Sequence, residues 1–170
     1  GGEVIAGAGE VHFLAGQLKE AEYFCDEALN NDSHNMYAGI VKGMVTGFKG
    51  DWNSAVNIMR PIIELAGDFN LALAFYGYAC AKNGNLALTN QLLQQLERKH
   101  HTPGAPPLDH LLSLMYISLG DKEKFYEYYE EASRKKIVSA LYYYNSPLLA
   151  DVAGEQRMLA IRKNLQMSSS

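Results

Sequence analysis

Apolar residues recur along this chain three or four positions apart, as at Leu92, Leu93 and Leu96, which is the spacing of one helix face. No stretch sustains the two-residue alternation of apolar and polar positions that half-buried strands show. Gly-Asp and Gly-Asn pairs separate stretches of about 12 to 15 residues, a normal helix length. The pattern predicts an all-α protein of about ten helices in antiparallel pairs, without a sheet.

A ladder of glycines marks the junctions between these stretches. Its members are Gly16, Gly50, Gly84 and Gly120, spaced by 34, 34 and 36 residues. Each glycine follows one predicted helix and precedes another, at a position where a positive φ favours glycine. Three of the residues that come next are good N-caps for the following helix: Asp51, Asn85 and Asp121.

A second ladder of small residues runs beside the first with the same period. It consists of Gly9, Gly43 and Gly77, with Ser113 in the fourth place. These positions fall in the middle of predicted helices, where glycine costs about 1 kcal/mol relative to alanine. Close approach of a partner helix would offset that cost. The second helices carry matching small residues: Ala21, Ala28, Ala55 and Ala132.

The 34-residue period of these positions resembles the tetratricopeptide repeat, a helix-turn-helix unit. The resemblance implies an α-solenoid of antiparallel helix pairs in a right-handed superhelix. It predicts one domain over residues 1–170, with repeats at 3–34, 36–68, 70–101 and 106–136 and a capping unit at 137–167. The C-terminal half, ending in "NSPLLADVAGEQRMLAIRKNL", resembles the tetratricopeptide segments of bacterial signalling proteins. In that group the segment follows a winged-helix regulator, an adenylate cyclase or a protein kinase domain.

The only tryptophan, Trp52, invites interpretation as the floor of a ligand site. It occupies the repeat position held by Leu18 in the first unit and Leu86 in the third, where aliphatic side chains do the same work. We therefore predict that Trp52 packs at the start of a second helix.

The repeat register also predicts a concave groove lined by first helices. Tyr37, Met44 and Phe48 are seven and four positions apart and share one helix face. The predicted partner-binding residues are Phe13, Tyr37, Ile40, Met44, Phe48, Tyr78, Lys82 and His110. Further first-helix residues expected to face the groove include Ala6, Glu10, Leu71, Ala74, Leu114 and Ile117. In an open groove, the double change Phe48→Ala and Tyr78→Ala removes binding and leaves the fold largely intact. The competing expectation is that the C-terminal helices fold back and fill the groove.

Composition and motifs limit the classes of function that we expect for this chain. The formal net charge is −4, so the chain lacks the excess of basic residues that nucleic-acid binding usually requires. No apolar run reaches the 18 residues of a membrane span. Cys25 and Cys80 lie in apolar surroundings and are expected to be buried thiols. The chain shows no P-loop, no GxGxxG motif after a strand and no local nucleophile–base set, so we expect neither catalysis nor a cofactor or metal. The expected compartment is the cytoplasm, or the periplasm if the parent protein is membrane-anchored.

Three functions remain open from the sequence. A solenoid most often presents an extended surface to a protein or peptide partner, which favours an interaction module. The alternatives are a sensor that takes a small apolar ligand in the same groove, and a spacer that dimerises an attached effector domain as a homodimer.

Overall fold

The computed structural model describes residues 2–168 and is all-helical over that range, with ten α-helices, one 3-10 helix and no strand. The predicted all-α fold is therefore confirmed; residues 1, 169 and 170 of the predicted domain lie outside the described part. In chain order the helices are α1 (Gly2–Leu14), α2 (Leu18–Asn31), α3 (Met36–Phe48), α4 (Trp52–Leu65), α5 (Asn70–Lys82), α6 (Leu86–His100), α7 (Asp109–Ser118), α8 (Lys122–Arg134), α9 (Val138–Tyr143), the 3-10 helix η1 (Pro147–Val152) and α10 (Gln156–Ser168).

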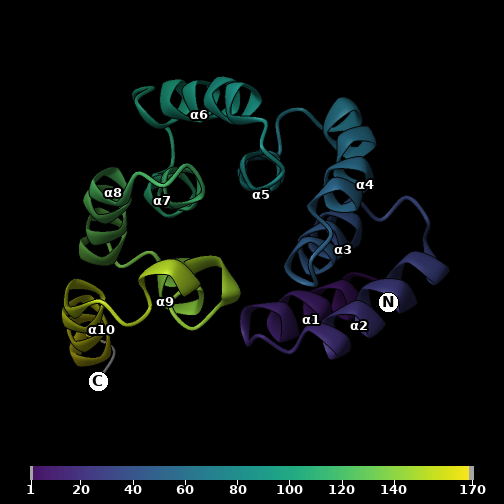
Figure 1. Cartoon of the computed structure of the whole chain (residues 1–170), viewed down its shortest axis with the longest axis horizontal. Coiled ribbons are helices and arrows are strands. Elements are labelled where there is room, and N and C mark those ends of the chain that lie inside the picture. Colours follow the sequence, from purple (N-terminus) through teal and green to yellow (C-terminus); the bar gives the residue numbers. More distant parts are fainter. Residues whose placement is uncertain (1, 169–170) are drawn as a thin grey trace.

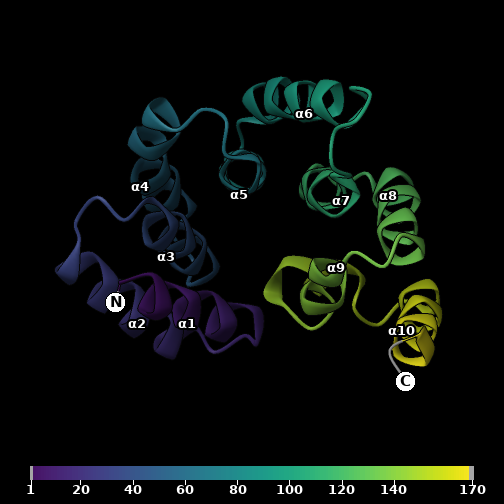
Figure 2. The same ribbon diagram turned by 180° about the vertical axis from the view of Figure 1, so that it is seen from behind.

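The helices pair in order and form two concentric layers (Figures 1 and 2). α1, α3, α5 and α7 form the inner layer, and α2, α4, α6 and α8 form the outer one. Each predicted repeat range matches one such pair, except that α1 begins at Gly2, one residue before the first range. Each inner helix from α1 to α5 also packs on the next inner helix. The last unit, α9 with η1, returns to the inner layer, where η1 contacts both α7 and α1. The chain therefore curves round until its C-terminal part meets its first helix.

The junction glycines behave as their ladder predicts. The φ angles of Gly16, Gly50, Gly84 and Gly120 are 78°, 112°, 89° and 80°, a region that side chains disfavour. The predicted caps are also confirmed, because the side chains of Asp51, Asn85 and Asp121 each accept a hydrogen bond from the backbone N–H three residues on.

The mid-helix glycines permit the close packing that their spacing predicts. A Cβ atom at Gly43 would lie 2.6 Å from Cγ of Met59 on α4, and one at Gly9 would lie 2.8 Å from Sγ of Cys25 on α2. The close neighbours are thus a methionine and a cysteine rather than the alanines that the sequence indicated. At Gly77 the nearest atom belongs to Met115 on α7, in the next repeat, so this glycine serves the contact between repeats.

Trp52 is a packing residue, as predicted. Its indole lies against the backbone of Gly47, at a place where any Cβ would collide with the ring. The ring also meets Phe48 edge-on, with centroids 4.9 Å apart, and lies 6.0 Å from the ring of Tyr78. The tryptophan thus packs the start of α4, an outer helix, against the inner helices α3 and α5.

The space between the inner helices is a hydrophobic core. Phe13 contacts the rings of Phe48 and Phe75 at 5.7 and 6.3 Å, which joins α1, α3 and α5. η1 closes this interior, because Leu148 and Leu149 are buried there and the Tyr78 hydroxyl donates a hydrogen bond to the Leu148 carbonyl at 3.0 Å. The expectation that C-terminal segments fill the inner side is therefore the one that the structure supports.

The prediction of an open concave groove is wrong for its central residues. Phe13, Ile40, Met44 and Tyr78 are buried in the core, as are Ala6, Ala74, Leu114 and Ile117. The repeat register placed them correctly on the inner layer, but the sequence pattern could not show that their side chains pack into a closed core. Tyr37, Phe48, Leu71 and His110 are half-buried.

Candidate functional site

Exposed apolar side chains lie on α9 and on α1, where the C-terminal part of the chain meets its first helix. On α9, Val138, Leu141 and Tyr142 are exposed and share one helix face, being three and four positions apart. On α1, Val4 and Val11 are exposed and seven positions apart, again on one face. Single exposed apolar residues are ordinary on a surface, whereas a contiguous group marks a candidate interaction site.

A cleft of about 490 Å3 lies between these two helices. We call it the α1–α9 cleft; its lining residues are Glu10, Val11, Leu14, Ala15, Leu141, Tyr142 and Asn145. Val11 is 67% exposed and Tyr142 is 61% exposed, so both side chains are accessible without any rearrangement of the fold. The walls are mainly apolar, and Glu10 supplies the charge.

Glu10 is half-buried in this apolar setting. Burial raises the pKa of the Glu10 carboxyl above its usual range, because desolvation disfavours the charged form. The charge of Glu10 in turn contributes to raising the pKa of the buried Tyr143 phenol, after the larger effect of desolvation. Within the described residues no cation or hydrogen-bond donor pairs with the Glu10 side chain. The cleft therefore contains an uncompensated acidic group.

α9 is short, and its other face anchors it. Ala140 and Tyr143 are buried, and the Ala140 carbonyl accepts a hydrogen bond from the Tyr129 hydroxyl at 2.6 Å. The Tyr143 ring stacks on His110 of α7 with centroids 6.2 Å apart. These contacts hold the helix with Leu141 and Tyr142 turned away from the core, so the exposed face is a fixed surface.

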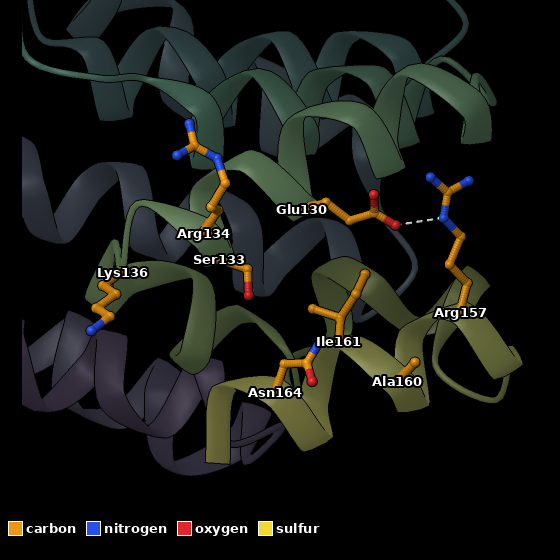
Figure 3. Close-up of a pocket in the computed structure, with 8 residues that line it drawn as sticks. All are labelled: Glu130, Ser133, Arg134, Lys136, Arg157, Ala160, Ile161 and Asn164. Atoms are coloured by element: carbon orange, nitrogen blue, oxygen red, sulfur yellow. Dashed lines mark hydrogen bonds and ion pairs between the residues drawn. The ribbon is translucent and has the colours of Figure 1, made fainter. Parts of the chain in front are cut away.

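A second cleft, of about 460 Å3, lies between α8 and α10 (Figure 3). We call it the α8–α10 cleft; its lining residues are Glu130, Ser133, Arg134, Lys136, Arg157, Ala160, Ile161 and Asn164. Arg157 donates to Glu130 at 2.6 Å, and Arg134 makes two bonds to Glu131, at 2.9 and 2.7 Å. Both guanidinium groups are thus already neutralised within the chain. This cleft is better explained as the junction that seats α10 on α8.

The remaining predicted groove residues have partners of their own. The Lys82 ammonium lies 3.5 Å from a carboxylate oxygen of Asp151 and 5.5 Å from the centre of the Tyr78 ring. It links α5 to η1. Nδ1 of His110 is buried without a hydrogen-bond partner among the described residues, and desolvation lowers the pKa of this imidazole. The structure does not bring Lys82 or His110 into the α1–α9 cleft.

The repeat register places Glu10 on the inward-facing side of its helix, but it does not indicate the other members of the cleft. Val11, Leu141 and Tyr142 carry no repeat signature, since they lie off the ladder positions. The signal that could have found them is the pairing of two faces on one short helix, with Val138, Leu141 and Tyr142 on one and Ala140 and Tyr143 on the other.

No protein-family model matches the chain, and a search of curated proteins finds no similar sequence. Within the described residues, no three His, Cys, Asp or Glu side chains gather closely enough to hold a metal ion. Both cysteines are buried free thiols, as predicted. Over the same part of the chain, every helix falls short of the length and apolar character that crossing a bilayer requires.

Proposed function

We propose that this chain is a non-catalytic protein–protein interaction module of the tetratricopeptide type, which docks a helix or peptide of its partner in the α1–α9 cleft. The observation that carries the proposal is the exposed apolar surface formed by Val11, Leu141 and Tyr142 around that cleft. Contiguous apolar surface with a polar group at its edge is typical of a docking site. The C-terminal half resembles the tetratricopeptide segments of bacterial signalling proteins. This resemblance favours a chain that is part of a larger signalling or transcription-regulatory protein in the bacterial cytoplasm.

The rigid placement of the cleft supports this role. α1 is held by α2, α3 and η1, and α9 is held by its contacts to α7 and α8. A partner that binds across α1 and α9 would meet two surfaces whose geometry is already set. Preorganised surfaces lose less conformational entropy on binding.

The test is affinity capture from an extract of the source organism with three baits. They are the wild-type chain, Tyr142→Ser in the cleft, and Tyr23→Ser as a matched control, since Tyr23 is 60% exposed on α2 and lies outside the cleft. We expect quantitative mass spectrometry to find one partner protein retained by wild type and Tyr23→Ser and lost with Tyr142→Ser. Equal capture by all three folded baits would overturn the proposal.

The volume of the cleft also suits a small apolar ligand, because ligand pockets commonly span about 300 to 1,000 Å3. In that case native mass spectrometry of the purified chain would show a stoichiometric bound molecule that Tyr142→Ser removes. A homodimeric spacer would instead show a concentration-dependent mass in analytical ultracentrifugation. The interaction module predicts a single mass, equal to that of one chain, at all concentrations.

A further inference from the structure

We propose that the partner of the α1–α9 cleft is a basic amphipathic peptide segment, which places one Lys or Arg side chain on Glu10 and its apolar side chains on Val11 and Tyr142. This inference rests on the proposed function and specifies the chemistry of its partner. It follows from the combination of apolar walls with a single uncompensated carboxylate in the same cleft.

The state of Glu10 differs from that of other carboxylates that connect elements in this chain. Asp26 pairs with Lys42, Glu22 pairs with Lys49 at 2.9 Å, and Glu155 accepts from Lys122 and from the Tyr126 hydroxyl. Each of those acidic groups forms an ion pair with a lysine of the same chain. Glu10 is half-buried, with no such partner in the described part.

A half-buried carboxylate without a counter-ion is unfavourable, because no ion pair offsets the free-energy cost of its desolvation. A basic side chain of the partner would offset this cost, because charge-assisted hydrogen bonds are about twice as strong as neutral ones. The apolar walls meanwhile require an apolar ligand surface. Both needs are met by a helix or extended peptide that presents apolar residues around one basic side chain.

The overall charge of the chain agrees with a basic partner. Its formal net charge is −4, so a cationic segment is attracted at long range as well as in the cleft. An acidic or purely apolar segment would leave the Glu10 carboxylate buried beneath it without compensation.

The test is selection of a displayed library of random 16-residue peptides against the full chain. Enriched peptides are then synthesised and their Kd values measured by fluorescence polarisation. The panel of chains is wild type, Glu10→Gln, Tyr142→Ser, and two controls outside the cleft, Glu130→Gln and Tyr23→Ser. For each peptide a twin with norleucine in place of its basic residue is measured as well.

We expect the enriched peptides to combine apolar residues with a Lys or Arg. Their affinity should fall about tenfold or more with Glu10→Gln or with the norleucine twin, and the two losses should not add, because both remove the same charge-assisted contact. Tyr142→Ser should abolish binding, and both controls should bind as wild type does.

Other outcomes separate this inference from the proposed function. Peptides that lose binding with Tyr142→Ser but bind Glu10→Gln and the norleucine twin unchanged would overturn the basic-partner inference and leave the docking site in place. A dimer of the chain that Tyr142→Ser dissociates would also overturn it, because a second copy would then occupy the cleft. Failure to enrich any peptide that distinguishes wild type from Tyr142→Ser would overturn both.

Discussion

At the scale of single residues, Glu10 is a half-buried acidic group that lines an apolar cleft. It lies one position before Val11 and two before His12 on α1, and no charge pattern in the sequence distinguishes it. In the folded chain it lines the cleft with Leu141 and Tyr142 of α9 and is half-buried. Its titration therefore reports on the assembled cleft rather than on α1 alone.

Glu10→Gln should stabilise the free chain at pH 7. In the unfolded chain a Glu carboxyl has a pKa of about 4.3, and in the folded chain the pKa of Glu10 is raised. Between these two values the folded state binds more protons, so stability falls as pH rises, and above the folded pKa the full penalty remains. Urea unfolding should show Glu10→Gln to be more stable than wild type at pH 7 and equal to it near pH 4.

The control for this prediction is Glu131→Gln, because hydrogen bonding to Arg134 lowers the pKa of the exposed Glu131 carboxyl. Its effect at pH 7 should be absent or of opposite sign. If Glu10→Gln proved less stable than wild type at pH 7, Glu10 would have a favourable partner within the chain.

Gly43→Leu should destabilise the fold by about 1 to 3 kcal/mol through overpacking. Even a Cβ atom at this position would lie 2.6 Å from Met59, in the contact between α3 and α4. The matched control is Gly7→Ala in α1, where a Cβ meets nothing within 4 Å and should add about 0.5 to 1 kcal/mol of stability. Thermal or urea unfolding measures both, and equal stability of Gly43→Leu and wild type would contradict the packing of this helix pair.

At the scale of elements, η1 adds apolar side chains to the core that the inner helices form. Ser146 caps it by accepting a hydrogen bond from the Leu148 N–H, and Pro147 stands at its first turn. Leu148, Leu149 and Val152 are buried against the inner helices. This six-residue segment thus adds three apolar side chains to the interior beside α1 and α7.

Tyr78→Phe should weaken the attachment of η1 to α5. The change removes the hydrogen bond that the Tyr78 hydroxyl donates to the Leu148 carbonyl, and such a bond contributes about 0.5 to 1.5 kcal/mol of stability. Amide exchange in residues 147–152 should accelerate relative to that in α3. Tyr142→Phe, which alters only an exposed phenol, should leave both stability and exchange unchanged; equal behaviour of the two variants would contradict the role of the Tyr78 hydroxyl.

At the scale of the whole molecule, the repeat period predicted the helix pairs, their caps and the positive-φ glycines, since these depend on local backbone geometry around Gly50 or Asp51. It also placed Met44 and Tyr78 on the inner layer. It could not predict that the inner side is filled. That outcome depends on the curvature summed over all the repeats, which decides whether Leu148 reaches the interior. For the same reason it could not find the α1–α9 cleft, which joins residues more than one hundred positions apart.

The closed interior reverses one expectation from the sequence. An open groove implied that Phe48→Ala with Tyr78→Ala leaves the fold intact, whereas the structure places both rings in one aromatic cluster with Phe13 and Trp52. Replacing a core aromatic residue by alanine costs about 3 to 5 kcal/mol, which applies to the buried Tyr78, and the half-buried Phe48 adds a further loss. A typical domain has only about 5 to 15 kcal/mol of stability. Circular dichroism should therefore show a large fall in Tm or loss of the fold, and a folded double variant with unchanged Tm would contradict the core assignment.

Hydroxyl-radical footprinting of the native chain, read residue by residue by mass spectrometry, tests the closed interior most directly. We expect rapid oxidation of Tyr142 and of Met36, which is 43% exposed, and protection of Tyr78 and Met44, which are 2% and 0% exposed, until the chain unfolds. Oxidation of Tyr78 and Met44 in the folded chain at the rates of Tyr142 and Met36 would contradict this expectation, and would show that the inner face is an open groove.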